Sequence, residues 1–285
     1  MSDQRTRNVE IFEDTMRCCK NNQALKSAVL HSRQTQYIIA ADEVLYIPKD
    51  HRYALPVNIV VSKKRSLEAA GAYRGKRVCV HNFASATNPG GGVARGSSAQ
   101  EEAICRCSTL YPNLIEMRAD FYDKHRQLLK EGKLDAVYND DCIYTPGVIV
   151  FKTDTQNPEK MPEQDWYTVD IITCAAPNLR EKPSNAMNPG SGSRAVKLSE
   201  EQLLSRHKKR MIRILSIARN KKAEVVVLGA FGCGAFCNPP EVVAEAMAQA
   251  VKEFQYDFSD IEFAVYCSPK HEKNYREFWQ KFNTK

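Results

Sequence analysis

A run of three glycines and a pair of adjacent glutamates stand close together in this chain, and their residue types suit acid–base chemistry beside an anion. The run is Gly90, Gly91 and Gly92, and after seven further residues come Gln100, Glu101 and Glu102. Glycine lacks a Cβ, so its backbone can take positive φ and approach a ligand closely, with its N–H groups facing anionic oxygens. A carboxyl group can serve as general acid or base. Without the glycines, the glutamates would indicate only the acid-rich first turn of a helix.

The two glutamates are expected to have different roles. Residues 100–110 predict a helix, and consecutive helical residues point about 100° apart, so Glu101 and Glu102 cannot present equivalent carboxylates to one bond. One should bind and the other react. The start of a helix lowers a carboxyl pKa, whereas two close carboxylates and a nearby anionic ligand raise it. We expect the raising effect to prevail when substrate is bound, because a general acid must hold its proton near neutral pH.

A second glycine-rich segment follows a predicted buried strand at residues 225–228. The loop after that strand carries Gly229, Gly232 and Gly234. Asn238 is predicted to cap the next helix, with Pro239 as its first residue. Backbone N–H groups from such a loop, together with a helix N-terminus, form a site for a diphosphate. The segment is not a P-loop, because no Gly-Lys-Ser/Thr follows, and its glycine spacing is wrong for a dinucleotide fingerprint.

Three side chains in this loop have competing interpretations. Phe236 could stack on a ribose or base, or it could pack in the core, and both interpretations stay open. Phe231 is more typical of the core. Cys233 would need a neighbouring base to act as a nucleophile, and none of the six histidines has a sequence context that nominates it. A cysteine-dependent hydrolase is therefore disfavoured.

The hydrophobic pattern of the chain predicts an α/β/α sandwich. Strands are expected at residues 57–61, 77–83, 143–151, 169–174, 225–228 and 263–267, and helices at 66–73, 100–110, 200–218 and 241–254. Several of these strands are continuously apolar, which is typical of strands covered by helices on both faces. The result is a single layered α/β domain.

Two further segments are organised differently. The first forty residues predict helix, because four apolar residues fall close to one helical face: Val9, Phe12, Met16 and Cys19. We therefore expect a helical accessory segment at 1–45 and the main domain at 46–285. Residues 182–194, KPSNAMNPGSGSR, predict a mobile surface loop. Its Asn-Pro-Gly at 188–190 matches the one at 88–90, although one tripeptide does not make a repeat.

Bulk composition narrows the class of protein. The chain has 285 residues and a formal net charge of +7, which favours anionic partners, including nucleic acid and phosphorylated ligands, without choosing among them. Ten cysteines without a secretory signal predict reduced thiols, and their spacing lacks the paired knuckles of a zinc site, so no metal is expected. The charged N-terminus and the lack of a long apolar run predict a soluble, cytoplasmic protein that does not enter a membrane.

Together, the two glycine-rich segments resemble the bacterial-type poly(ADP-ribose) glycohydrolase family. The triple glycine followed by Gln-Glu-Glu is similar to the signature of these glycohydrolases, and residues 82–89, NFASATNP, resemble the bacterial-type branch. Residues 229–236, GAFGCGAF, resemble the family's phosphate loop, and residues 173–178, TCAAPN, also look like bacterial-type sequence. The resemblance covers the chain from about residue 10 to its end. The two motifs together are much more specific than either one.

The resemblance implies a three-layer α/β/α macrodomain with a mixed central sheet that binds ADP-ribose. It implies hydrolysis of the ribose–ribose O-glycosidic bonds of poly(ADP-ribose), mainly from the chain end, without metal or redox cofactor. Glu102 would protonate the departing ribose oxygen and then activate water, while Glu101 would hold ribose hydroxyls. The expected substrate-binding residues are Asn88, Gly90, Gly91, Gly92 and Gln100 around the terminal ribose, and Gly232, Cys233, Gly234, Ala235 and Phe236 against the diphosphate. A diphosphate there would stabilise an oxocarbenium-like transition state.

The expected partners are poly(ADP-ribose) or an ADP-ribosylated protein, and the product ADP-ribose. A mono-ADP-ribosyl hydrolase would use a similar pocket, and a non-catalytic ADP-ribose-binding macrodomain would keep the glycine loops but should not need Glu102. A nucleic-acid-binding protein whose glycine loops contact phosphates is a third alternative, with nucleic acid unlikely as the primary ligand. The tyrosine-bearing clasp of the animal enzymes is not located in this sequence, which disfavours cleavage inside the polymer.

Overall fold

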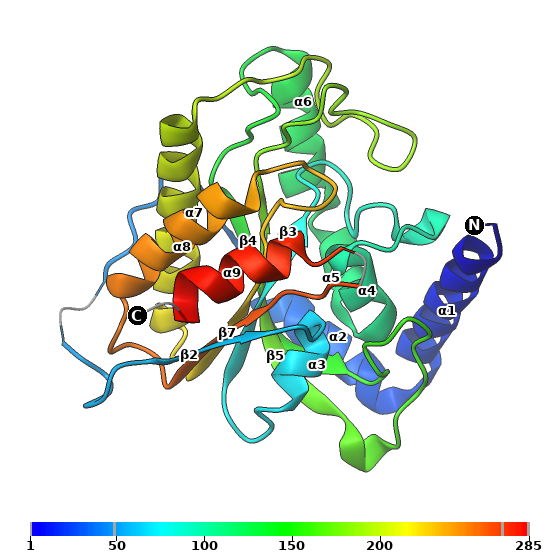
Figure 1. Cartoon of the computed structure of the whole chain (residues 1–285). Helices are drawn as coiled ribbons and strands as arrows, with labels where there is room; N and C mark the ends of the chain where they lie inside the picture. Colours follow the sequence, from blue (N-terminus) through cyan, green and yellow to red (C-terminus); the bar gives the residue numbers. More distant parts are fainter. Residues whose placement is uncertain (1, 48–49, 269–270, 284–285) are drawn as a thin grey trace.

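A seven-stranded mixed sheet forms the centre of the computed structural model, which describes residues 2–47, 50–268 and 271–283 (Figure 1). The strands are β1 (Tyr37–Ile39), β2 (Asn58–Ser62), β3 (Val78–Ala84), β4 (Cys142–Val150), β5 (Tyr167–Ala175), β6 (Val225–Leu228) and β7 (Asp260–Ala264). Their order in the sheet is β1-β4-β5-β3-β6-β7-β2. The pairs β1–β4 and β4–β5 are antiparallel and the others are parallel. The expected mixed sheet is confirmed.

Helices cover both faces of this sheet, which confirms the three layers (Figure 1). One face carries α7 (Glu200–Asn220), α8 (Pro240–Lys252) and α9 (Lys273–Asn283). The other carries α2 (Gln23–Thr35), α3 (Ser66–Gly71), α4 (Gln100–Cys107) and α5 (Leu110–Glu116). The remaining helical elements are α1 (Ser2–Asn21), α6 (Lys124–Lys130), the π-helical turn η2 (Arg118–Asp123) and the 3₁₀ turns η1 (Val93–Arg95) and η3 (Glu163–Asp165).

The central strand β3 shows why this sequence produces two cores. Val78 and Val80 belong to the core under α3, α4 and α5, whereas Cys79 belongs to the core under α7 and α8. Side chains alternate between the two faces of a strand, so an apolar residue at every position is buried on both sides. Burial on both faces fixes the place of β3 in the sheet, and the candidate site begins where this strand ends.

Two elements differ from the sequence prediction. The helix predicted at 100–110 ends at Cys107, because Ser108 forms a β-bridge with Val150 and the N–H of Thr109 donates to the carbonyl of Ile149 over 3.0 Å. The strand predicted at 263–267 begins and ends three residues earlier, as β7 (Asp260–Ala264). The polar Glu262 interrupts the apolar pattern, yet it is 1% exposed and accepts a hydrogen bond of 2.6 Å from Ser62.

The N-terminal segment is helical over α1 and α2, but its last part was predicted wrongly. Residues 37–39 form the edge strand β1, which pairs with β4 and so belongs to the central sheet. The division into 1–45 and 46–285 stays a prediction. In the loop at 182–194, Pro183, Asn188 and Ser191 are buried, so the expected surface location was wrong for these three residues. The expected mobility of that loop stays a prediction.

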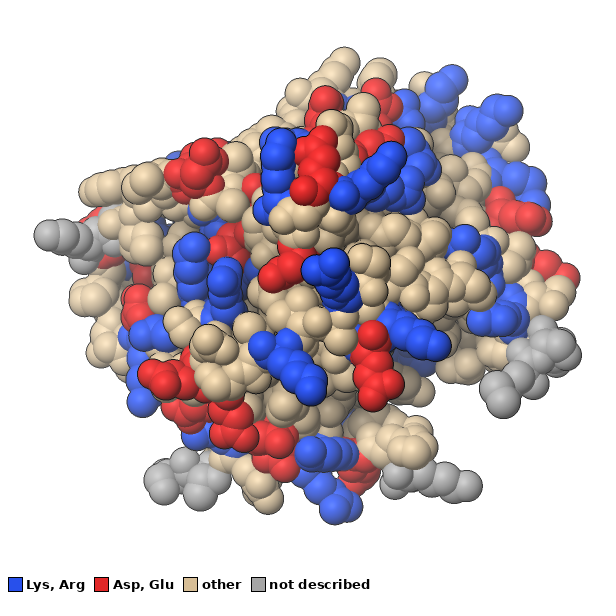
Figure 2. Space-filling view, turned by 90° about the horizontal axis from the view of Figure 1, so that it is seen from above, with Lys and Arg blue, Asp and Glu red and all other residues tan. Residues whose placement is uncertain are grey.

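Surface charge and thiols complete the description. Lys and Arg side chains are interspersed with Asp and Glu over the face seen in Figure 2. All ten cysteines carry free thiols. Among residues 2–47, 50–268 and 271–283, no three His, Cys, Asp or Glu side chains gather as they would around a metal ion. No helix in the same part of the chain is long and apolar enough to cross a membrane.

Candidate active site

A cleft of about 1150 Å³ lies where the parallel strands end. It receives residues that follow β3, β5, β6 and β7, because the carboxyl ends of parallel strands meet at one edge of the sheet. The cleft brings together nine of the twelve predicted site residues: Gly91, Gly92, Gln100, Glu101, Glu102, Gly232, Gly234, Ala235 and Phe236. Asn88, Gly90 and Cys233 are not among its lining residues.

The first glycine run contacts the second of the two glutamates directly. Gly91 has a φ of +59°, and a Cβ there would lie 2.5 Å from Oε1 of Glu102, so a larger residue would displace that carboxyl group. The N–H of Gly92 donates to the same Oε1 over 2.9 Å. The oxygen that this N–H faces therefore belongs to the protein itself. The loop fixes the position of Glu102 on the first turn of α4.

The two glutamates have different hydrogen-bond partners. Glu101 is 3% exposed and accepts from the N–H of Ser85 over 2.8 Å and from Nδ2 of Asn82 over 3.4 Å, one bond to each carboxyl oxygen. Glu102 is 7% exposed, and its Oε2 has no hydrogen-bond partner among the residues that the structure describes. Both oxygens of Glu101 are held by the protein, whereas Glu102, which lines the cleft, keeps one buried oxygen without a partner. This asymmetry fits the expected division of roles.

Burial raises the pKa of both carboxyl groups. For Glu102, burial is the largest effect on the pKa, and the N–H of Gly92 opposes it. For Glu101, burial is again the largest effect, and the charge of Glu102 raises the pKa further. The direction agrees with the expectation from the sequence, but its main cause is desolvation, which disfavours the charged form, and not the proximity of two charges.

The second glycine loop is shaped by an asparagine whose role was predicted wrongly. The helix α8 begins at Pro240 with Pro239 as its N-cap residue, so Asn238 does not cap it. Instead, Nδ2 of Asn238 donates to the carbonyls of Pro177 (2.7 Å) and Gly232 (3.0 Å), and its Oδ1 accepts from His207 (2.9 Å). Gly232 has a φ of +79°, and a Cβ there would lie 2.6 Å from Cβ of Ala176. A side chain at position 232 would therefore clash with the loop after β5.

The same loop offers hydrogen-bond donors to the cleft. Within the described residues, the N–H groups of Gly232, Gly234, Ala235 and Phe236 have no acceptor. The ring of Phe236 is partly buried. The guanidinium carbon of Arg180 lies over this ring, 5.5 Å from the ring centroid. Phe231 is 1% exposed and packs on His81, so it belongs to the core as expected. Burial raises the pKa of the Cys233 thiol, which disfavours a thiolate nucleophile.

Asn88 and Gln100 use their amides within the protein. Gln100 accepts from the N–H of Phe83 (2.9 Å) and donates to the carbonyl of His81 (2.8 Å), which ties α4 to the end of β3. Asn88 donates to Oδ1 of Asn188 over 2.6 Å. The two Asn-Pro-Gly tripeptides of the sequence thus lie against each other and join the loops after β3 and β5.

Sequence reasoning missed several residues of the cleft. Arg106 stands one helical turn after Glu102 and donates to the carbonyl of Ser97 over 2.5 Å, and its position four residues after Glu102 was a usable signal. Asn8 of α1 is 3% exposed and donates to the carbonyl of Gly96 over 3.0 Å. Other lining residues that were missed include Gln4, Arg5, Arg65, Asp154, Arg180 and Tyr266. Nothing local in the sequence connects these positions with the glycine loops.

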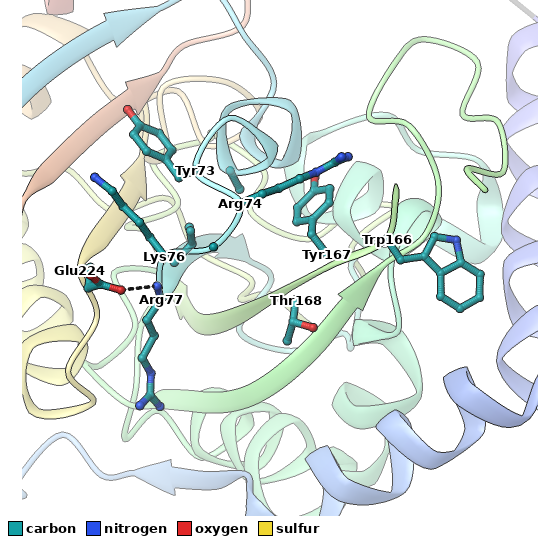
Figure 3. A pocket seen from close by; sticks show the side chains of 11 residues that line it. Tyr73, Arg74, Lys76, Arg77, Trp166, Tyr167, Thr168 and Glu224 are labelled. Carbon is teal, nitrogen blue, oxygen red and sulfur yellow. Dashed lines mark hydrogen bonds between the residues drawn. The ribbon is translucent and has the colours of Figure 1, made fainter. Parts of the chain in front are cut away.

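A second cavity, of about 580 Å³, lies at the opposite edge of the sheet, where β3, β5 and β6 begin (Figure 3). Three cations line it, and each has a carboxylate partner: Arg74 with Asp165, Lys76 with Asp260 and Arg77 with Asp170. The cavity contains none of the predicted site residues. Its cations are already neutralised, which makes it a poor site for an anion.

Comparison with known proteins identifies relatives over the whole chain. The family model described as microbial-type PARG, catalytic domain, matches residues 2–153. The structure of a poly(ADP-ribose) glycohydrolase (PARG) from Thermomonospora curvata is 26% identical, with a TM-score of 0.79 over 99% of this chain and 100% of that chain. A structure of PARG from the same organism bound to the inhibitor ADP-HPD is also 26% identical, with a TM-score of 0.77 over the same shares.

A PARG from Deinococcus radiodurans in complex with ADP-ribose is 29% identical, with a TM-score of 0.69 over 89% of this chain and 96% of that chain. No curated protein sequence matches significantly.

Proposed function

This chain belongs to the microbial-type poly(ADP-ribose) glycohydrolase (PARG) family, and from this premise we propose that it hydrolyses the ribose–ribose O-glycosidic bonds of poly(ADP-ribose), mainly from the chain end, and releases ADP-ribose. The observation that carries the proposal is the buried, unpartnered Oε2 of Glu102 in a cleft that also offers unpaired N–H groups. The carboxyl group of Glu102 can exchange a proton with a reacting oxygen, and the N–H groups can hold a diphosphate. The protein is thus a glycosidase of the macrodomain type.

Glu102 is the general acid and base of the proposed reaction. Its raised pKa favours the protonated form that the first step needs, in which the proton passes to the departing ribose oxygen. The resulting carboxylate then takes a proton from the water that attacks the anomeric carbon. Gly91 and Gly92 hold Oε1 in place, so that Oε2 is the oxygen that exchanges the proton.

The loop from Gly232 to Phe236 binds the diphosphate of the terminal unit in this proposal. Free N–H groups satisfy phosphate oxygens without a metal ion, and the negative diphosphate lies close enough to stabilise positive charge that develops on the ribose. Phe236 supports the ribose with its ring face. Cys233 contributes to the shape of the loop, because its partly buried thiol packs against the core and its N–H donates to the carbonyl of Ala230 over 3.1 Å.

Glu101, Asn88 and Gln100 have supporting roles. The carboxyl group of Glu101 is held by Ser85 and Asn82 and accepts from ribose hydroxyls with its remaining lone pairs. The amides of Asn88 and Gln100 are engaged inside the protein, which supports indirect roles in placing the ribose, through the loops that they join. Gly90 acts through its backbone in the same way.

The helix α1 supports action at the chain end. Gln4, Arg5 and Asn8 line the cleft, and Asn8 holds the loop before α4 through the carbonyl of Gly96. A wall at this place leaves room for a terminal ribose but obstructs a polymer that would continue through the cleft. We therefore expect ADP-ribose monomers as the product, without oligomers.

The test is digestion of purified poly(ADP-ribose) of defined length, with products separated at early times. We expect ADP-ribose to appear from the start while the long chains shorten gradually. Early oligomers would contradict action at the chain end. Release only from mono-ADP-ribosylated protein would favour the mono-ADP-ribosyl hydrolase, and tight polymer binding without turnover would favour the non-catalytic binding module.

A further inference from the structure

An asparagine of the loop at 182–194 lines the cleft with one half of its amide unused by the protein. Asn188 is 8% exposed, and its Oδ1 accepts from Oγ of Ser85 and from Nδ2 of Asn88, each over 2.6 Å. Its Nδ2 has no acceptor within the part of the chain that the structure describes. This nitrogen is also not one of the described polar atoms that are sealed from solvent, so it faces the open space of the cleft.

The hydrogen bonds around Asn188 determine which end of its amide faces the cleft. The side chain of Arg126 has only donors, and its Nη2 donates to Oδ1 of Asn88 over 2.5 Å. The amide of Asn88 is therefore held with its Nδ2 towards Asn188, where a donor requires an acceptor. Oδ1 of Asn188 meets this requirement, so its Nδ2 lies on the opposite side. Arg126 thus sets the orientation of an amide in the cleft through one intervening asparagine.

Ser85 places this free donor beside the first glutamate. The N–H of Ser85 donates to Oε2 of Glu101 over 2.8 Å, and its Oγ donates to Asn188. One residue therefore holds an acceptor and a donor of the cleft close to each other. A hydroxyl group can use both, because it donates one proton and accepts through its lone pairs.

The other parts of the proposed site limit which hydroxyl groups can lie here. The diphosphate belongs at the loop from Gly232 to Phe236, where unpaired N–H groups are available. The terminal ribose belongs at Glu102, and Glu101 is the next residue in the chain. The hydroxyl groups of this ribose are uncharged and can both donate and accept, so they match the pair formed by Glu101 and Asn188.

We propose that Nδ2 of Asn188 donates to a hydroxyl oxygen of the terminal ribose while Glu101 accepts from a hydroxyl group of the same ribose, and that Arg126 orients this amide through Asn88. The inference rests on the proposed function, because it takes ADP-ribose as the ligand. It assigns ribose recognition to a residue that stands 100 positions after Asn88 and outside both glycine motifs. Asn188 is a binding residue in this arrangement, and Arg126 is a positioning residue.

The experiment is calorimetric titration of the full chain with ADP-ribose and with ADP, which ends at the diphosphate and lacks the terminal ribose. We expect the parent to bind ADP-ribose about tenfold more tightly than ADP. Asn188→Ala removes the donor, so ADP-ribose should bind about fivefold to tenfold more weakly, while the affinity for ADP changes by less than about twofold. Asn188→Asp keeps an acceptor for Ser85 and Asn88 but presents an oxygen to the ribose, and it should lose at least as much.

The matched control is Asn185→Asp, at an exposed position of the same loop. Oδ1 of Asn185 accepts from the N–H groups of Met187 and Asn188, and an aspartate retains this acceptor. The substitution adds the same charge as Asn188→Asp without changing the amide that faces the ribose. It should keep the parental ratio of the two affinities.

A parental ratio in Asn188→Ala would overturn the ribose contact. An equal loss of affinity for both ligands would overturn it as well, because the amide would then only shape the loop. If the parent binds ADP-ribose no more tightly than ADP, the contact is wrong, while release of ADP-ribose from the polymer still decides the proposed hydrolysis. If the parent binds neither ligand, the proposed function fails too.

The positioning role of Arg126 is tested separately, because Arg126 is not among the described residues that line the cleft. Arg126→Met removes the donor that holds Asn88, so both amides can turn over. We expect ADP-ribose to bind about threefold more weakly, with the affinity for ADP unchanged. Arg126→Lys keeps a side chain that only donates and should restore the parental ratio. A parental ratio in Arg126→Met, or no recovery in Arg126→Lys, would contradict the orientation of Asn188 through Asn88.

Discussion

Two neighbouring carboxyl groups with the same burial acquire different chemistry from their partners. Glu101 uses both oxygens for bonds within the protein, whereas Oε2 of Glu102 is buried without a partner. Both bear the cost of burial, which appears as raised pKa values. An acid kept protonated by desolvation is suited to give its proton to a leaving group, and this environment is produced by the fold before any substrate binds.

Because the pKa of Glu101 is raised in the folded protein, the free energy of unfolding is expected to decrease as pH rises. A folded state that binds more protons than the unfolded chain loses stability with increasing pH, from the ordinary carboxyl value of 4.5 up through the raised folded pKa. Glu101→Gln removes this proton linkage. We expect its free energy of unfolding in urea to fall less than that of the parent between about pH 5 and about pH 8.

Glu116→Gln, at an exposed position on α5, serves as the control and should follow the parent. Identical pH slopes for the parent and Glu101→Gln would mean that Glu101 is not protonated in the folded protein.

Asparagines hold the loops around the cleft. Asn88 joins the loops after β3 and β5 through Asn188, and Asn238 joins the second glycine loop to the residues after β5. Each bond links segments far apart in the chain, and each is buried. Buried amides with several partners determine loop shape, because losing one leaves several groups unsatisfied.

Asn238→Ala is therefore expected to affect both stability and ligand binding. It removes the bonds to Pro177, Gly232 and His207, and we expect the free energy of unfolding to fall by about 2 to 3 kcal/mol. The affinity for ADP-ribose should fall as well, because the loop that offers the N–H groups loses its support.

The control for this variant is Asn220→Ala, which removes one exposed bond to the carbonyl of Tyr46. It should change stability by no more than about 0.5 kcal/mol. If Asn238→Ala is destabilised but keeps the parental affinity for ADP-ribose, the bonds of Asn238 are not needed for ligand binding, which contradicts the prediction.

Local spacing was sufficient to single out the glycine run and the glutamates and to predict the strands around them, because those features depend on neighbours in sequence. Long-range contacts decided the rest. Asn238 looked like a helix cap until the fold placed it beside Pro177, and the polar Glu262 concealed the start of β7 because its partner Ser62 lies on another strand. Asp154 carries no local pattern, and only the fold places it in the cleft, where its Oδ2 accepts from the N–H of Leu67 at the start of α3.

At the scale of the whole molecule, the sheet collects the site from distant parts of the chain. The parallel strands deliver their loops to one edge, and α1 adds a wall from the other end of the sequence. The chain carries a net charge of +7, and its cations and anions are interspersed over the face in Figure 2. Such a charge attracts a polyanion over long distances, but it contributes little to chemistry inside a buried cleft.

Salt should therefore affect capture of the polymer more than the chemical step. Between about 50 and about 300 mM salt, we expect kcat/KM for long poly(ADP-ribose) to fall several-fold, while the single-turnover rate of the saturated complex stays constant. Steady-state and quenched-flow assays on the same preparation measure the two quantities. A parallel fall of both would indicate that exposed charges act on the reaction itself.

The most direct test of the role of Glu102 is single-turnover release of ADP-ribose from purified polymer by the parent and by Glu102→Gln, with ADP-ribose affinity measured for both. Glutamine retains an acceptor for the N–H of Gly92 but cannot transfer the proton. We expect release to slow by about a thousandfold or more, with affinity unchanged within about threefold. Release by Glu102→Gln at the parental rate would contradict acid–base catalysis by this residue.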